Sequence, residues 1–230
     1  MTRGCAAAAE APKARAHAKD NKPMTDPAID FASLLCSRLC HDLLSPVGAL
    51  NNGLELLADE TDPQMRARCM ELLTESARAS ADKLKFFRLA FGAAGGFGDE
   101  ISERDAKQAV EGLVRGNSKI ILGWVVDRPA FSRGETRILL NLALIAIDAL
   151  VRGGRLDIGV EGGDMVVRAE GPRLVLDAEV RAVLAGTSDA PMASRTIGAS
   201  LIQVLAGQEG RSVQIAEQEG VLLLGASRTG

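Results

Sequence analysis

The stretch LCHDLLSPVGALNNGLELL, residues 39–57, decides the first half of the fold. Apolar residues recur in it every three or four positions, and the same spacing extends toward the N-terminus, which is the pattern of an amphipathic helix. Asp26-Pro27 adds a start signal, because Asp is a favoured N-cap and proline suits the first helical position. The apolar series of this predicted helix is Ala32, Leu35, Leu39, Leu43, Pro46, Leu50, Leu54 and Leu57.

A second helix of the same kind is predicted after the break ADETDPQ, residues 58–64, where Asp62-Pro63 repeats the start signal. Two helices of about 30 residues make an antiparallel hairpin roughly 45 Å long. A lone hairpin cannot cover its apolar stripe, so we expect residues 25–92 to pair with a second copy in a two-fold symmetric four-helix bundle. The second apolar series is Cys69, Leu73, Ser76, Leu84, Phe87 and Phe91.

The rest of the chain divides into flanking segments and a second domain. Residues 1–24, rich in Ala, Lys, Pro and Glu, predict a disordered extension, and the glycine-rich residues 93–100 predict a linker. Residues 101–228 alternate between helical and strand patterns, which favours a two-layer α/β sandwich. We expect helices at 102–114, 135–151, 177–185 and 193–206, and strands at 119–127, 155–162, 164–171, 212–218 and 221–227. The predicted fold class is therefore α plus α/β.

Composition excludes several classes of partner. The net charge is −3 and no Lys/Arg cluster stands out, which argues against nucleic acid or an anionic membrane as the main partner. No apolar run reaches the roughly 18 residues needed to cross a bilayer. The N-terminal segment has no compact apolar stretch leading to a cleavage site, so we expect a cytoplasmic protein.

His41, one of two histidines in the chain, lies far from the apolar stripe of the first helix. On a helical wheel it falls roughly 160° from the centre of the stripe, so a buried core histidine is disfavoured. Asp42 can accept the proton of Nδ1 and leave Nε2 as a free nucleophile. The face of His41 is shared by Arg38 and Ser45, which we expect to hold phosphoryl oxygens, and by Gly48 and Asn52.

Metal and haem sites are disfavoured at His41. Haem attachment needs Cys-x-x-Cys-His, whereas residues 36–41 read CSRLCH, with one residue too many between the cysteines. Zinc needs further ligands, and the only other histidine, His17, lies in the predicted extension. We expect no metal and no cofactor on this chain.

The segment CHDLLSPV, residues 40–47, resembles the phosphorylation box of histidine kinases, Ser-His-Glu/Asp-Leu-Arg-Thr-Pro-Leu, which lies on the first helix of their dimerisation hairpin. The resemblance implies that His41 is the phospho-accepting residue and Asp42 its acidic neighbour. The Arg-Thr pair of the box is replaced by Leu44-Ser45. Leu44, at the edge of the exposed face, suits a docking surface.

The second domain resembles the ATP-binding domain of these kinases without its nucleotide ligands. Residues 141–146 match the Asn-Leu-Leu-x-Asn-Ala box, but Ile145 stands at the magnesium ligand and cannot coordinate a hard cation. Residues 169–173 lack the Asp and one Gly of the Asp-x-Gly-x-Gly box. Residues 195–199 are a reduced glycine-rich loop. We therefore expect a degenerate ATPase-like domain that does not bind ATP.

Over residues 28–228, the chain resembles the ChpT-type histidine phosphotransferases, which are kinase-like dimers that keep the histidine and have lost ATP binding. The segments RLCHDLLSPVGALNNGLELL and KLKFFRLAFGAAG carry this likeness. It implies a relay in which the receiver domain of a hybrid histidine kinase phosphorylates His41, and response regulators of cell-cycle control then take the phosphoryl group. Any Mg²⁺ is expected on the receivers.

Some roles remain open at the level of the sequence. Asn52 on the first helix and Arg88 on the second are candidates for docking an acidic receiver face, although Arg88 also fits a solvated helix flank. Two other functions are alternatives. One is a true ATP-dependent histidine kinase, and the other is a non-catalytic dimeric module that binds regulators.

Overall fold

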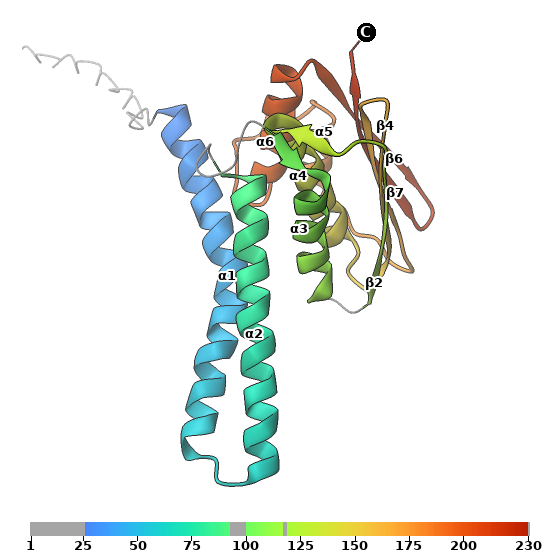
Figure 1. Ribbon diagram of the computed structural model, residues 1–230. Helices are drawn as coiled ribbons and strands as arrows, with labels where there is room; N and C mark the ends of the chain where they lie inside the picture. The colour runs from blue at the N-terminus through green and yellow to red at the C-terminus, as the bar shows by residue number, and fades with distance from the viewer. Residues whose placement is uncertain (1–25, 93–99, 117–118, 230) are drawn as a thin grey trace, which may run out of the picture.

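The first half of the computed structural model, which describes residues 26–92, 100–116 and 119–229, is an antiparallel helical hairpin. Its helices are α1 (Pro27–Asp59) and α2 (Pro63–Ala90), joined by a short loop at the far end (Figure 1). Both predicted start signals are confirmed, because the Asp26 side chain accepts from Ala28 N at 2.9 Å and the Asp62 side chain accepts from the first turn of α2.

The predicted flanking segments fall mostly outside the described residues. This holds for the extension at residues 1–24 and for residues 93–99 of the predicted linker. Glu100 corrects the end of that linker, because it begins strand β1 (Glu100–Ser102), which pairs antiparallel with β3 (Ala130–Ser132).

The second half is a five-stranded sheet with its helices on one face, so the predicted two-layer sandwich is confirmed (Figure 1). The strand order is β2-β4-β5-β7-β6, in which β2 and β4 are parallel and the other neighbours are antiparallel. The strands are β2 (Ile120–Val126), β4 (Gly154–Glu161), β5 (Asp164–Glu170), β6 (Arg211–Gln218) and β7 (Val221–Arg228). The helices are α3 (Glu103–Arg115), α4 (Arg133–Ala149), α5 (Ala178–Leu184) and α6 (Ile197–Gln208).

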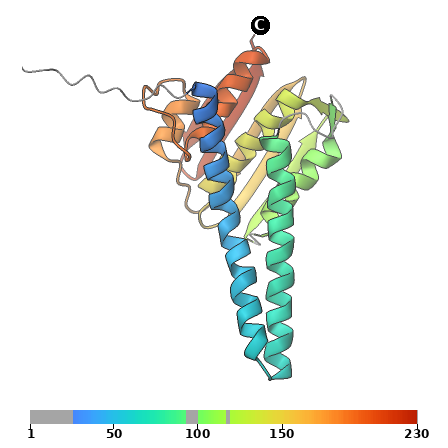
Figure 2. The same cartoon turned by 90° about the vertical axis from the view of Figure 1, so that its left-hand side faces the viewer.

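The hairpin and the sandwich share one core at the end of the hairpin that carries its termini. Phe86, Phe87 and Ala90 of α2 are buried in the same cluster as the apolar face of α4, and Phe31 and Leu39 of α1 pack against it. Helices α3, α4 and α6 therefore lie between the hairpin and the sheet (Figures 1 and 2). The other end of the hairpin projects beyond the sheet, and there only Cys69 and Leu73 are buried between α1 and α2.

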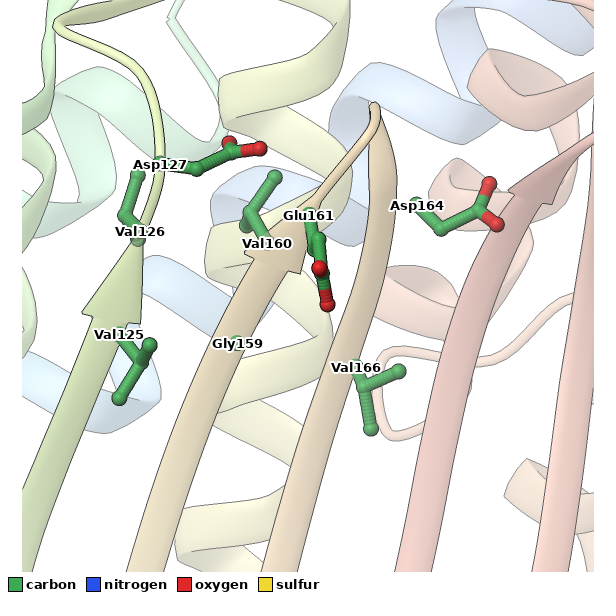
Figure 3. A pocket seen from close by; sticks show the side chains of 8 residues that line it. All are labelled: Val125, Val126, Asp127, Gly159, Val160, Glu161, Asp164 and Val166. Atoms are coloured by element: carbon green, nitrogen blue, oxygen red, sulfur yellow. The ribbon is translucent and has the colours of Figure 1, made fainter.

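Within the described residues, no other element covers the outer face of the sheet, which carries a shallow hollow. Val125, Gly159 and Val166 lie opposite one another on β2, β4 and β5, and the glycine leaves bare backbone between the two valines (Figure 3). The carboxylates of Asp127 and Asp164 cap the backbone N–H groups of Gly162 and Arg228. This hollow lies on the opposite face of the sheet from the helices and the hairpin.

Candidate functional site

His41 lies near the middle of α1 with its side chain 83% exposed, which agrees with its predicted place opposite the apolar stripe. Its Nδ1 is 3.1 Å from Asp42 Oδ1. A carboxylate can only accept, so this contact puts the imidazole proton on Nδ1 and leaves the lone pair on Nε2. Nε2 makes no hydrogen bond within the described part of the chain and faces solvent. The arrangement leaves Nε2 available as a nucleophile.

Asp42 accepts hydrogen bonds both at its side-chain carboxylate and at its backbone carbonyl. Arg38 Nε donates to Asp42 Oδ2 at 2.6 Å, and Lys83 of α2 donates from Nζ to the Asp42 carbonyl at 2.8 Å. That carbonyl has no partner within α1, because the residue four positions on is Pro46, which lacks an N–H. Lys83 therefore supplies the hydrogen bond that proline removes, and α1 continues through Pro46 without interruption.

Arg38 makes contacts that the sequence did not show. Instead of standing open beside His41, its guanidinium binds Asp42 and also donates from its terminal nitrogen to Asp148 Oδ2 of α4 at 2.7 Å. Burial lowers the pKa of Arg38, but the Asp148 and Asp42 carboxylates outweigh that effect and raise the pKa overall. Arg38 thus links Asp42 to α4, and its role in holding a phosphoryl group stays a prediction.

The other predicted residues form an exposed strip along α1. Leu44 is 69% exposed, Ser45 and Asn52 are exposed, and a side chain added at the half-buried Gly48 would meet open space. Arg88 is exposed on α2, five residues beyond Lys83 and so about 7.5 Å further along the helix axis. The four α1 residues share the face of His41, where a docking partner would meet them, and their roles, like that of Arg88, remain predictions.

Lys83 and Asp148 were not found from the sequence. Pro46 signals that the Asp42 carbonyl needs a donor, but the donor comes from the other helix of the hairpin. Asp148 is an acid in the otherwise apolar second half of α4, which is a weak signal of a special role. Its partner Arg38 lies 110 positions away, so the pairing needs the tertiary structure.

The residues at the positions that resemble nucleotide-binding boxes make structural contacts within the protein. Asn141 is fully buried, and its Nδ2 donates to the Ala90 carbonyl at the end of α2 at 3.0 Å and to the Arg137 carbonyl at 2.8 Å. Ile145 packs against the apolar core and Ala169 is buried on β5. Arg195 pairs with Glu179 at the surface. Asn141 thus ties α4 to the hairpin.

A helical hairpin with an exposed histidine and an α/β sandwich packed on its side defines a class of phosphotransfer protein, and comparisons with known proteins identify the family. Residues 103–221, more than half of the chain, match the histidine phosphotransferase C-terminal domain family. The chain therefore belongs to the histidine phosphotransferases.

Two relatives support this assignment. The protein phosphotransferase ChpT of Brucella abortus (strain 2308) is 43% identical over 144 residues, which cover 61% of this chain and 65% of the relative. The match thus spans less than two thirds of the relative's own length. A solved bacterial phosphotransferase superposes with a TM-score of 0.78 at 31% identity, covering 89% of this chain and 99% of that chain.

Among the described residues, every helix is too short or too polar to cross a membrane.

Proposed function

We propose that this chain is the histidine phosphotransferase of a two-component phosphorelay, with His41 as the residue that carries the phosphoryl group. The donor is the receiver domain of a hybrid histidine kinase, and the acceptors are response regulators of cell-cycle control. The observation that carries the proposal is the exposed imidazole of His41, whose Nδ1 faces Asp42 and whose Nε2 is open to solvent. Membership of the histidine phosphotransferase family supports the same activity.

The reaction follows from this geometry. The Nε2 lone pair of His41 forms a bond to phosphorus while the P–O bond of the receiver's aspartyl phosphate breaks, and the electron pair leaves on the receiver's carboxylate. The proton on Nδ1 stays in place. The ring becomes positively charged as Nε2 is phosphorylated, and the Asp42 carboxylate beside Nδ1 stabilises that charge. Transfer to a second receiver reverses these steps.

We further propose that the protein does not phosphorylate itself from ATP. Ile145 offers no oxygen to a magnesium ion, and Asn141 is fully buried, with its Nδ2 tying α4 to α2. Each receiver brings its own metal site, so this chain needs only His41, Asp42 and a docking surface. That surface is the exposed strip of Leu44, Ser45, Gly48 and Asn52, with Arg88 on α2.

The functional unit is proposed to be a homodimer formed by the hairpins. In the single chain, the part of the hairpin that projects beyond the sheet exposes large apolar side chains on both helices, including Leu54 at 56% and Leu72 at 60%. Several large apolar side chains exposed along one stretch of the hairpin suit an interaction site. Pairing two hairpins into a four-helix bundle would cover it.

A reconstituted transfer assay tests the function. A receiver domain of a hybrid kinase, labelled with [32P]acetyl phosphate, is mixed with the wild type, with His41→Ala, or with His17→Ala. His17→Ala is the matched control, because it removes the only other histidine. We expect acid-labile label on the wild type and on the control but none on His41→Ala. Transfer between two receivers equally well with His41→Ala would overturn His41 as the carrier, and absence of label on the wild type would favour a non-catalytic binding module.

The ATP-dependent alternative has a separate test. The wild type is incubated with [γ-32P]ATP and Mg²⁺ without any receiver. We expect no label on the protein. Labelling that disappears in His41→Ala would show an autokinase and refute the part of the proposal that concerns ATP.

A further inference from the structure

We propose that Arg38 and Asp148 are positioning residues for the transfer reaction, which fix the Asp42 carboxylate and thereby select the imidazole tautomer of His41. The proposal rests on the proposed function of His41. It assigns the α/β domain a part in the chemistry, because Asp148 belongs to α4 of that domain whereas the other three residues lie on α1.

The four side chains form a continuous series of hydrogen bonds. Asp148 Oδ2 accepts from a terminal nitrogen of Arg38 at 2.7 Å, and Arg38 Nε donates to Asp42 Oδ2 at 2.6 Å. The second oxygen of the same carboxylate, Oδ1, lies 3.1 Å from His41 Nδ1. Because Arg38 occupies one oxygen of Asp42, the carboxylate is held in the orientation that aims the other oxygen at the imidazole.

The histidine needs this support because the protein holds it by little else. Its side chain is 83% exposed, so Asp42 must decide which ring nitrogen carries the proton. The Asp42 and Arg38 side chains are only 16% and 21% exposed, and charge pairs shielded from solvent in this way are screened less by salt than surface pairs.

Asp148 restricts the conformation of Arg38, which the Arg38–Asp42 pair alone does not do. An Arg and an Asp four residues apart on one helix interact weakly when the arginine is free to choose among rotamers. Asp148 binds the far side of the guanidinium and so restricts Arg38 to the rotamer that reaches Asp42. Lys83 acts separately, on the backbone carbonyl of Asp42 rather than on its carboxylate.

A purely structural reading is that Arg38–Asp148 only joins the two domains. A second ion pair between the two domains serves as a control for this interpretation. Arg115 at the end of α3 donates to Asp82 of α2 at 2.9 Å, which also joins the α/β domain to the hairpin but does not touch Asp42. Loss of Arg115 therefore weakens the junction and leaves the imidazole tautomer unchanged.

The test measures the tautomer directly. Protein labelled with [15N]histidine is examined by two-bond 1H–15N correlation spectra above the ordinary imidazole pKa of about 6.5, with His17→Ala used to assign the His41 signals. We expect the wild type to carry its proton mainly on Nδ1. Asp148→Asn and Arg38→Gln should shift the population toward protonated Nε2, whereas Asp148→Glu and Arg115→Gln should keep the wild-type population.

Rates of transfer from the labelled receiver complete the test. We expect Asp148→Asn and Arg38→Gln to slow phosphorylation of His41 roughly three- to tenfold, because a charge-assisted hydrogen bond is lost. An unchanged tautomer in Asp148→Asn, or an equal shift in Arg115→Gln, would overturn the positioning role. Failure of the wild type to accept phosphate would instead refute the proposed function, whatever the tautomer shows.

Discussion

Lys83 and Pro46 lead to a prediction about the stability of α1. The ammonium of Lys83 donates to the Asp42 carbonyl, which would otherwise be unsatisfied inside the helix because Pro46 has no N–H. Lys83→Met keeps much of the side chain's length and removes its donor. Leaving a part-buried carbonyl without a partner costs about 1–3 kcal/mol. We therefore expect Lys83→Met to lower the free energy of unfolding by about 2 kcal/mol.

A double-mutant cycle isolates this interaction from the other effects of the two residues. Pro46→Ala restores an N–H at position 46, which can donate to the Asp42 carbonyl in the ordinary helical pattern. In that background the carbonyl keeps a partner after Lys83→Met, so the second substitution should cost less than about 0.5 kcal/mol. The charge lost at Lys83 and the volume lost at the buried Pro46 are common to both arms and cancel in the difference.

The measurement is urea-induced unfolding of the four proteins, followed by circular dichroism at one protein concentration, because a dimer gains apparent stability with concentration. We expect a coupling energy of about 1.5 kcal/mol between the two positions. Equal costs of Lys83→Met in the wild-type and Pro46→Ala backgrounds would refute the reasoning, since Lys83 would then act through its charge or its packing alone.

Three further predictions concern the core, the pH dependence of stability and the dimer. Glu135→Gln leaves Arg211, whose side chain is 2% exposed, without its carboxylate, so unfolding experiments should show a loss of about 3–5 kcal/mol. Burial raises the pKa of Glu135, but the Ser132 N–H, Arg128 and Arg211 outweigh that effect and lower the pKa overall. The extra free energy of unfolding of the wild type over Glu135→Gln is therefore fully present above the ordinary glutamate pKa and should shrink as the pH falls below it. A pH series of urea melts on both proteins measures this change. Leu54→Glu places a charge on the proposed dimer face in both subunits and should raise the dimer dissociation constant at least about tenfold by light scattering, with an unchanged dissociation constant counting against the bundle.

The sequence predicted the fold well where its signals are local and repeated. The caps Asp26 and Asp62 and the spacing of apolar residues define α1 and α2, and alternation defines the five strands of the main sheet. Strands β1 and β3 were missed because three residues are too few to show a period of two. Leu54 and Leu84 belong to the predicted apolar series yet are exposed in the single chain, which is what an interface between two copies requires.

The site was predictable only as far as it lies on one helix. His41 and Asp42 are adjacent, and the helical wheel places Arg38 within reach of both. The wheel could not show that Arg38 is engaged by two carboxylates, because Asp148 comes from another element and competes with solvent and phosphate for the guanidinium. A cation near an expected phosphoryl site is therefore ambiguous until its carboxylate partners are known.

The contacts between the two halves give a physical reason for an α/β domain in a protein that we propose does not bind ATP. Asn141 and Asp148 lie two turns apart on α4, and both of them bind the hairpin: one the end of α2, the other Arg38 beside the candidate phospho-acceptor. Ile145, between them, packs against the core. The helix that resembles a nucleotide-binding helix thus presents Asn141 to α2 and Asp148 to α1. In this arrangement the α/β domain fixes the position of α1 and α2, and the tautomer measurement on Asp148→Asn tests whether this support extends to the His41 imidazole.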